Sequence, residues 1–191
     1  MEIFFNYIQS MTVEFMNFTL SIFTVFTQII IVIILISLIL HTKNKKENFV
    51  LRLFGAHALL ITFIIALTGT LVSLYYSDIV GFEPCKLCWL QRIVLYPQVL
   101  LLGMANYKND KNIVDYSILL SAVGALIAAF HYSEQMRANP LAPCSAVGYA
   151  VSCADSYVQY FGYVTIPLMS LSAFALMIMT MIAYKVCNKK K

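Results

Sequence analysis

Five long apolar segments dominate the pattern of hydrophobic and polar positions along this chain. Short polar stretches separate them, and each segment has about the 20 residues that a helix needs to cross about 30 Å of hydrocarbon. The third segment fits this pattern least well, because it contains Gln91, Arg92 and Pro97. The pattern predicts membrane-spanning helices at Phe18–Leu40, Leu53–Tyr75, Leu87–Tyr107, Ile113–Tyr132 and Phe161–Tyr184.

The segment before the first apolar stretch, Met1–Asn17, has a mixed composition. Its apolar residues recur at helical spacing, which is typical of a helix lying on the membrane surface; a disordered tail is the alternative. We expect no secretory signal peptide, because the first forty residues contain no Lys or Arg and Phe18–Leu40 is too long for a signal h-region.

The composition supports a polytopic membrane protein. Of the 191 residues, 61% are hydrophobic and 12% are charged, which leaves too little polar surface for a soluble domain. This length suits one small helical bundle better than two domains. The fold class that we expect is therefore all-α, within the bilayer.

The positions of the basic residues predict the orientation of the helices. If five helices alternate in direction, all three basic clusters fall on one side, which the positive-inside rule makes cytoplasmic. The N-terminus then lies outside and the C-terminus inside. The clusters are Lys43, Lys45, Lys46 and Arg52, then Lys108 and Lys111, then Lys185, Lys189, Lys190 and Lys191.

The cysteines are sorted by the same topology. Cys85 and Cys88 precede the third helix, and Cys144 and Cys153 lie in the loop at 133–160, so both pairs are extracytoplasmic. Only Cys187 falls on the cytoplasmic side, where we expect a reduced thiol without a role. Because disulfides persist on the oxidising side of a membrane, this sorting indicates thiol–disulfide chemistry.

Cys85 and Cys88 form a C-x-x-C motif at the expected start of a helix, directly after Pro84. The free N–H groups and the dipole of a helix start favour the thiolate, which is the species that attacks a disulfide. A passive disulfide or half of a zinc site are the alternatives. Zinc fits poorly, because the other cysteines are eight residues apart and no outer His stands at ligand spacing. We therefore expect no metal.

Cys144 and Cys153 share their loop with Pro140, Pro143 and Gly148. They could form a structural disulfide that holds the loop, or a mobile disulfide that shuttles between a soluble partner and the helix-borne pair. With two pairs on one face of the membrane, electrons could move between them by successive exchange.

Exchange alone creates no oxidising power, so an electron acceptor is needed. The sequence contains no dinucleotide fingerprint and no haem-attachment motif, whereas a lipid-soluble quinone could reach cysteines at the membrane boundary. Arg92 follows Cys88 by one helical turn and could stabilise both a thiolate and a reduced quinone; otherwise it extends to the outer head groups. His131 could donate a hydrogen bond or a proton to the quinone ring, or simply pack at the membrane interface. Gln91 and His57 are weaker candidates that could bond across the bundle instead.

At these residues the sequence resembles the DsbB/BdbC family of bacterial disulfide-formation proteins. The motif Pro84–Arg92 has the form P-C-x-L-C-W-x-Q-R, and a second similar stretch is Phe161–Leu171. The resemblance covers about Leu53–Tyr184 and includes the order of the cysteines and the topology. The first helix, Phe18–Leu40, is extra to the usual four, and Cys187 has no role in the family.

The resemblance implies a four-helix bundle in the bacterial cytoplasmic membrane, with ubiquinone or menaquinone as electron acceptor. It also implies a DsbA-like partner of thioredoxin fold, and no nucleic-acid partner. By position, Cys144 would form the mixed disulfide with the partner, and Cys153 would exchange with Cys85. Cys88 would face the quinone with Arg92 beside it, and His131 falls near a quinone contact of the family. Gln91 is a further candidate for quinone binding.

The expected organisation has three parts. Residues 1–52 hold the extra helix and a basic cytoplasmic loop, residues 53–184 form the four-helix redox domain, and residues 185–191 form a basic tail.

Three other functions are compatible with parts of the pattern. A vitamin K epoxide reductase-like protein is also quinone-linked, but that family places its loop cysteines before its C-x-x-C. A membrane conduit for reducing equivalents usually buries its cysteines within the spans. A non-enzymatic scaffold with two structural disulfides explains the sidedness, but not an Arg one turn after a C-x-x-C at a helix start.

Overall fold

A computed structural model describes the backbone of residues 2–44, 48–137, 153–154 and 156–188, and the side chains of these residues except 2–10 and 44. All structural statements below refer to these residues. The helices are α1 (Glu2–Asn44), α2 (Phe49–Ala56), α3 (Ala58–Leu74), α4 (Lys86–Lys108), α5 (Ile113–Met136) and α6 (Ile166–Asn188), with a π-helical turn η1 (Tyr75–Ile79) after α3. Two short antiparallel strands, β1 (Gln159–Tyr160) and β2 (Val164–Thr165), form a hairpin before α6.

The prediction of five spanning helices is confirmed. Five helices are long and apolar enough to cross a membrane, including the uncertain third one, which Pro97 does not interrupt. Large apolar side chains stay exposed along their outer faces, for example Ile33 on α1, Leu100 on α4 and Leu126 on α5. Such surfaces would be unstable in water and suit lipid.

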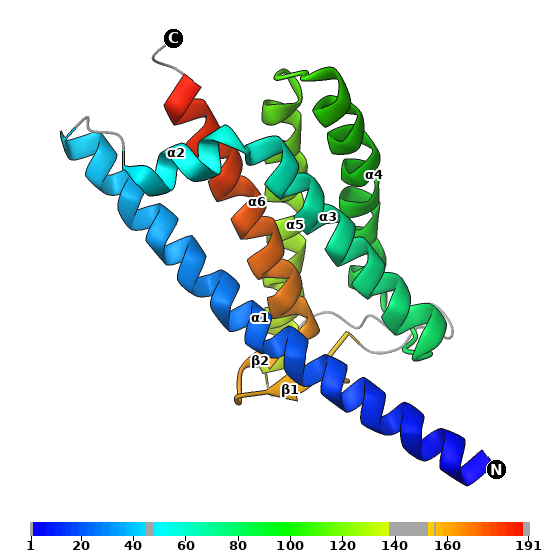
Figure 1. Ribbon diagram of the computed structural model, residues 1–191. Coiled ribbons are helices and arrows are strands. Elements are labelled where there is room, and N and C mark those ends of the chain that lie inside the picture. The colour runs from blue at the N-terminus through cyan, green and yellow to red at the C-terminus, as the bar shows by residue number, and fades with distance from the viewer. Residues whose placement is uncertain (1, 45–47, 138–152, 155, 189–191) are drawn as a thin grey trace.

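Four of these helices form one bundle. α3 packs against α4, α4 against α5, α5 against α6, and α6 back against α3 (Figure 1). The additional helix α1 lies outside this ring and contacts α6, while α2 lies across the end of the bundle (Figure 1). The expected all-α fold, a membrane four-helix bundle with one extra N-terminal helix, is therefore confirmed.

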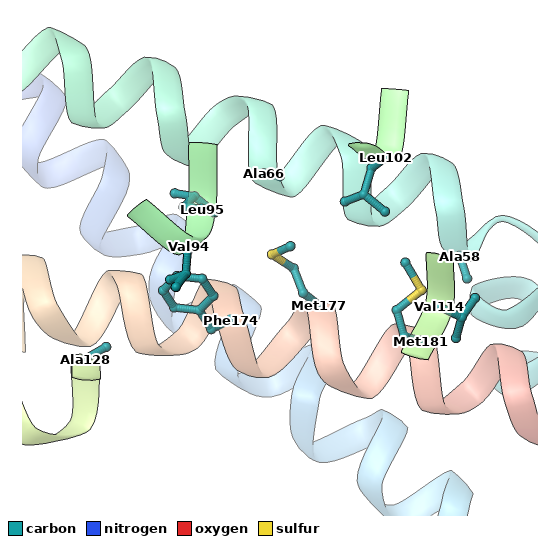
Figure 2. Close-up of a cluster of buried hydrophobic side chains, with 10 residues drawn as sticks. All are labelled: Ala58, Ala66, Val94, Leu95, Leu102, Val114, Ala128, Phe174, Met177 and Met181. Atoms are coloured by element: carbon teal, nitrogen blue, oxygen red, sulfur yellow. The ribbon is translucent and has the colours of Figure 1, made fainter. Parts of the chain in front are cut away.

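The centre of the bundle is apolar and tightly packed. Phe174, Met177 and Met181 of α6 project toward side chains of the other three bundle helices (Figure 2). Gly124 of α5 lies against the ring of Phe174, where a Cβ atom would overlap three ring atoms. Small residues let membrane helices approach closely and gain dispersion energy, so this glycine sets the distance between α5 and α6.

Two of the predicted helix boundaries were wrong. The second apolar segment breaks at His57, so Leu53 belongs to α2 and the spanning helix begins at Ala58. The last one begins at Ile166 and not at Phe161, because residues 161–163 form the turn of the hairpin. Phe161 and Gly162 both have positive φ, at 53° and 77°, a backbone conformation that cannot belong to a right-handed helix. Apolar composition continues through both breaks, so hydropathy alone could not detect them.

The N-terminal segment is not a separate surface helix or a tail. It is continuous with α1, whose apolar part, Met11–Lys43, has 33 residues. At 1.5 Å per residue this length of about 50 Å exceeds the hydrocarbon core, so α1 must tilt or extend beyond it. Figure 1 shows α1 crossing the bundle obliquely and projecting past it at the N-terminal end.

The two ends of the bundle differ. The N-terminal end of α1, the start of α4 and the β-hairpin lie at one end, and the C-terminal end of α6 lies at the other (Figure 1). The residues of the C-x-x-C motif therefore lie at the same end as the segment that leads from Cys153 into the hairpin.

Candidate functional site

Cys85 and Cys88 lie at the first turn of α4. Cys85 is the N-cap residue, with extended backbone geometry, and its Sγ atom accepts a hydrogen bond of 3.4 Å from the backbone N–H of Cys88. Pro84 precedes the cap, where its missing N–H costs no helical hydrogen bond. Both cysteines are free, and their Sγ atoms lie 3.2 Å apart. A small rotation of the side chains would allow them to form a disulfide.

His131 of α5 completes this group. Its Nε2 atom lies 3.6 Å from Cys85 Sγ, and its Nδ1 atom lies 3.2 Å from Gln91 Nε2 on α4. Cys85, Gln91 and His131 are all buried. The Gln91 amide holds the imidazole ring so that Nε2 points at the sulfur of Cys85.

The environment of Cys85 favours its thiolate. Cys85 precedes the membrane-spanning part of α4, and the hydrogen bond from the Cys88 thiol lowers its pKa below the ordinary value for cysteine. The contact with His131 lowers the pKa further, while burial raises it and is outweighed. Cys85 is therefore the nucleophilic member of the reduced pair in this geometry.

Arg92 lies one turn after Cys88 and is directed toward α3. Its Nε atom donates to Ser73 Oγ at 2.9 Å and its Nη2 atom to the Ser73 carbonyl at 3.0 Å. The guanidinium also lies over the ring of Trp89, 5.2 Å from its centroid. These contacts fix the cation beside the C-x-x-C turn, and Nη1 makes no hydrogen bond to another described residue.

A small cavity of about 30 Å³ opens beside the two cysteines and His131. It has room for one or two water molecules but not for an aromatic ring. Three polar residues that line it, Glu83, Gln135 and Ser156, were not among the predicted site residues. Gln135 follows His131 by one helical turn, so the spacing of i and i+4 on one helix face could have indicated it.

The segment after Cys153 covers this cavity. Cys153 is buried and disulfide-bonded, while Cys144 lies outside the described residues. Tyr157 and Val158 line the cavity, and the Tyr157 ring stacks on Phe82 with centroids 4.5 Å apart. The described part of the loop is therefore packed directly beside Cys85 and Cys88.

The structure also brings together three possible metal ligands. Ligand atoms of Cys85, Cys88 and His131 all lie within 4.8 Å of one another. The sequence argument against zinc used the absence of a His at ligand spacing along the chain. That argument does not hold in three dimensions, because His131 comes from another helix.

Not all of the residues singled out in the sequence belong to this site. His57 is exposed at the break between α2 and α3, at the other end of α3 from the cysteines. Cys187 lies near the end of α6 outside any disulfide, and its thiol donates to the Leu51 carbonyl at 3.3 Å. It packs against Gly55 of α2, so its contacts are those of a packing residue.

Comparisons with known proteins place most of the chain in one group. The family model described as "Disulfide bond formation protein DsbB" matches residues 55–184. "Disulfide bond formation protein C" of Bacillus subtilis is 40% identical over 126 residues, which is 65% of this chain and 89% of that protein. "Probable disulfide formation protein C" of Bacillus cereus is 45% identical over 132 residues, 69% of this chain and 88% of the relative. No solved structure matches significantly.

Proposed function

This chain belongs to the DsbB family of disulfide bond formation proteins, and we propose that it oxidises a DsbA-like extracytoplasmic thiol oxidoreductase and passes the electrons to a membrane quinone. The family is one of disulfide-forming oxidoreductases, and its members' names state disulfide formation. The observation that carries the proposal is the Cys85–Cys88 pair at a helix start, with His131 against Cys85 and the segment after Cys153 packed over it.

The proposed orientation places this site on the outer side of the membrane. The basic residues near the ends of α1, α4 and α6 lie at the opposite end of the bundle, which would face the cytoplasm. A soluble extracytoplasmic partner could then reach the segment between α5 and β1, which contains Cys144 and Cys153.

The first step is oxidation of the partner at the loop pair. A thiolate of the reduced partner attacks Cys144 in a Cys144–Cys153 disulfide, which forms a mixed disulfide and releases Cys153 as a thiolate. The second thiolate of the partner then attacks the mixed disulfide. The partner then leaves with an internal disulfide, and Cys144 and Cys153 stay reduced.

The second step moves the two electrons to the helix-borne pair. When Cys85 and Cys88 are joined, the Cys153 thiolate attacks Cys85 and displaces Cys88 as a thiolate. Cys144 then attacks Cys153, which restores the loop disulfide and leaves Cys85 and Cys88 as thiols. The packing of the segment after Cys153 against the cavity keeps this transfer short.

Cys88 and Arg92 face the side from which a quinone would approach. When bound, a quinone supplies the acceptor for two electrons and two protons. The cavity is too small for its ring, so the head group would approach along the lipid-exposed face that carries Trp89 and Ile93. Arg92 fits a quinone, because its Nη1 makes no hydrogen bond to another described residue and a fixed cation stabilises negative charge on oxygen. At the inner side of the pair, Gln91 holds the His131 ring, and His131 Nε2 can donate to Cys85 Sγ.

The test uses the purified full-length protein in lipid nanodiscs with a reduced DsbA-like partner and either ubiquinone or menaquinone. We expect quinone reduction, followed by absorbance, in a one-to-one ratio with partner disulfides formed. Cys88→Ser should abolish turnover, while Cys187→Ser, at the other end of α6, should leave it unchanged. Partner oxidation that continues without any quinone would contradict the proposed acceptor, and a lack of turnover with both quinones would favour a non-enzymatic scaffold.

A further inference from the structure

We propose that Cys85, Cys88 and His131 form a zinc site that exists only while the two cysteines are reduced, so that Zn²⁺ holds the pair in its reduced, dithiolate form. This site goes beyond the proposed oxidase function and does not depend on which oxidant restores the disulfide. At this site Zn²⁺ would act as an inhibitor of the protein and not as a resident cofactor.

The distances between the ligand atoms are close to those of a tetrahedral zinc centre. With Zn–S bonds of about 2.3 Å and Zn–N bonds of about 2.0 Å, two sulfurs lie about 3.8 Å apart and a sulfur and a nitrogen about 3.5 Å apart. Here the two Sγ atoms are 3.2 Å apart, and Cys85 Sγ is 3.6 Å from His131 Nε2. Cys88, which is only half-buried, can rotate to complete the set, since all ligand atoms already lie within 4.8 Å.

The surroundings can complete the coordination. The cavity of about 30 Å³ touches all three ligands and can hold a water molecule as the fourth ligand. Glu83 and Gln135 line the same space and could accept hydrogen bonds from this water. Two thiolates neutralise the double charge of the ion, so the centre is neutral overall.

Gln91 supplies the support that a zinc-bound histidine usually needs. A metal on Nε2 leaves the proton of the ring on Nδ1, and Nδ1 lies 3.2 Å from the Gln91 amide. After rotation of this amide, its oxygen accepts the Nδ1–H and holds the ring in place. Such partners of a ligating histidine typically change metal affinity by about 10- to 100-fold.

The redox state of the pair controls the site. Zn²⁺ binds the two sulfurs as thiolates, so any proton that they still carry is released and no electrons move. Formation of the Cys85–Cys88 disulfide removes both sulfur ligands and must expel the ion. Conversely, bound Zn²⁺ occupies both sulfurs and prevents their oxidation.

The test isolates this pair in the full-length protein. In a Cys144→Ser/Cys153→Ser background in detergent micelles, the reduced protein is titrated with Zn²⁺ against a chromophoric zinc indicator, and with Co²⁺ as a spectroscopic substitute. We expect one ion per chain, thiolate-to-cobalt charge-transfer absorption, and release of the ion when the pair is oxidised. Cys187→Ser should bind equally well.

Two comparisons decide the outcome. His131→Ala should weaken zinc binding at least tenfold, and Gln91→Ala should weaken it less. The oxidised protein needs no substitution, so its failure to bind cannot reflect misfolding. Equal affinity in the oxidised protein, or in a folded His131→Ala variant, would overturn the proposal, whereas absence of quinone turnover would leave it intact.

Discussion

At the scale of single residues, Arg92 supplies the positive charge of the proposed acceptor site. Two-electron reduction of a quinone builds negative charge on its oxygens, and a fixed cation in a region with little water lowers the energy of that charge. Ser73 holds the guanidinium through Nε and Nη2, so Arg92 is positioned before any ligand arrives. Its effect should therefore fall on electron acceptance and not on exchange with the partner.

We predict that Arg92→Ala raises the apparent KM for quinone and lowers turnover. Loss of one charge-assisted hydrogen bond is worth about 1.5–3 kcal/mol, or a change of roughly tenfold to over a hundredfold. Arg92→Lys should recover only part of this, because a point charge lacks the planar fork. Ser73→Ala, which loosens the anchor but keeps the charge, is the matched control and should have a smaller effect. The measurement is steady-state kinetics with quinone varied; normal kinetics in Arg92→Ala would reduce this residue to a structural anchor.

Gly124 makes a second prediction at this scale, about stability. A methyl group at this position would overlap the Phe174 ring, and overpacking of this kind costs about 1–3 kcal/mol. Gly124→Ala should lower the resistance of the protein to thermal denaturation in detergent. Gly69→Ala is the matched control, since its Cβ would meet only one flexible atom, Leu95 Cδ2, at 3.2 Å. Equal effects of the two substitutions would show that Gly124 does not set the helix distance.

At the scale of elements, the two cysteine pairs occupy different kinds of structure. Cys85 and Cys88 belong to a helix start, and Cys153 belongs to the segment that leads into the hairpin. We predict that Cys153→Ser abolishes oxidation of the partner, yet leaves the Cys85–Cys88 disulfide able to form with quinone. Alkylation of free thiols before and after addition of quinone separates the two events. A Cys153→Ser protein that oxidises the partner at the normal rate would make the loop pair merely structural.

The inner face of the additional helix α1 carries buried polar side chains. Asn17, Ser21 and Thr24 are buried on its inner face, and Asn17 Oδ1 accepts a hydrogen bond of 2.6 Å from the hydroxyl of Tyr76. Tyr76 stacks on Phe82, and Phe82 stacks on Tyr157 at the cavity. This series of contacts connects α1 to the cover of the cysteine site.

We predict a measurable coupling between Asn17 and Tyr76. A double-mutant cycle with Asn17→Ala and Tyr76→Phe should give an interaction energy of about 0.6 kcal/mol, and at most about 1.7 kcal/mol, as for other hydrogen bonds between membrane helices. The stability of the full-length protein in mild detergent is the readout. Phe23→Ala, on the exposed face of α1, is the control and should not couple to Tyr76→Phe. Strictly additive effects of Asn17→Ala and Tyr76→Phe would show that the bond contributes nothing to docking of α1.

At the scale of the whole molecule, the prediction concerns topology. We expect the N-terminus and both cysteine loops outside, and the basic tail inside. A membrane-impermeant thiol reagent, added to intact cells after reduction, should label the cysteines of the outer side but not Cys187. Single-cysteine variants show which cysteine carries the label, and labelling of permeabilised cells confirms that Cys187 can react. Labelling of Cys187 alone in intact cells would reverse the orientation.

The sequence by itself determined the number of spans, the fold class and the cysteine motif. Hydropathy is a sum over neighbouring residues, so a stretch such as Ile113–Tyr132 identifies a spanning helix without knowledge of its neighbours. The C-x-x-C motif is equally local, because three residues of helix set the distance between Cys85 and Cys88. In a membrane an apolar segment of this length must form a helix, since backbone groups buried in lipid must be hydrogen-bonded within the segment itself.

Only the tertiary structure decided which side chains meet. His131 and Gln91 reach the cysteines because α4 and α5 pack together, and Arg92 reaches Ser73 because α3 lies on its other side. The breaks at His57 and Phe161 were equally hidden, because the residues on both sides of each break are apolar and hydropathy does not record backbone conformation. The polar face of α1 is fixed by its contact with α6 and Tyr76. Such contacts depend on the relative rotation of helices, which one-dimensional hydropathy does not encode, because packing and hydrogen bonds between helices set it.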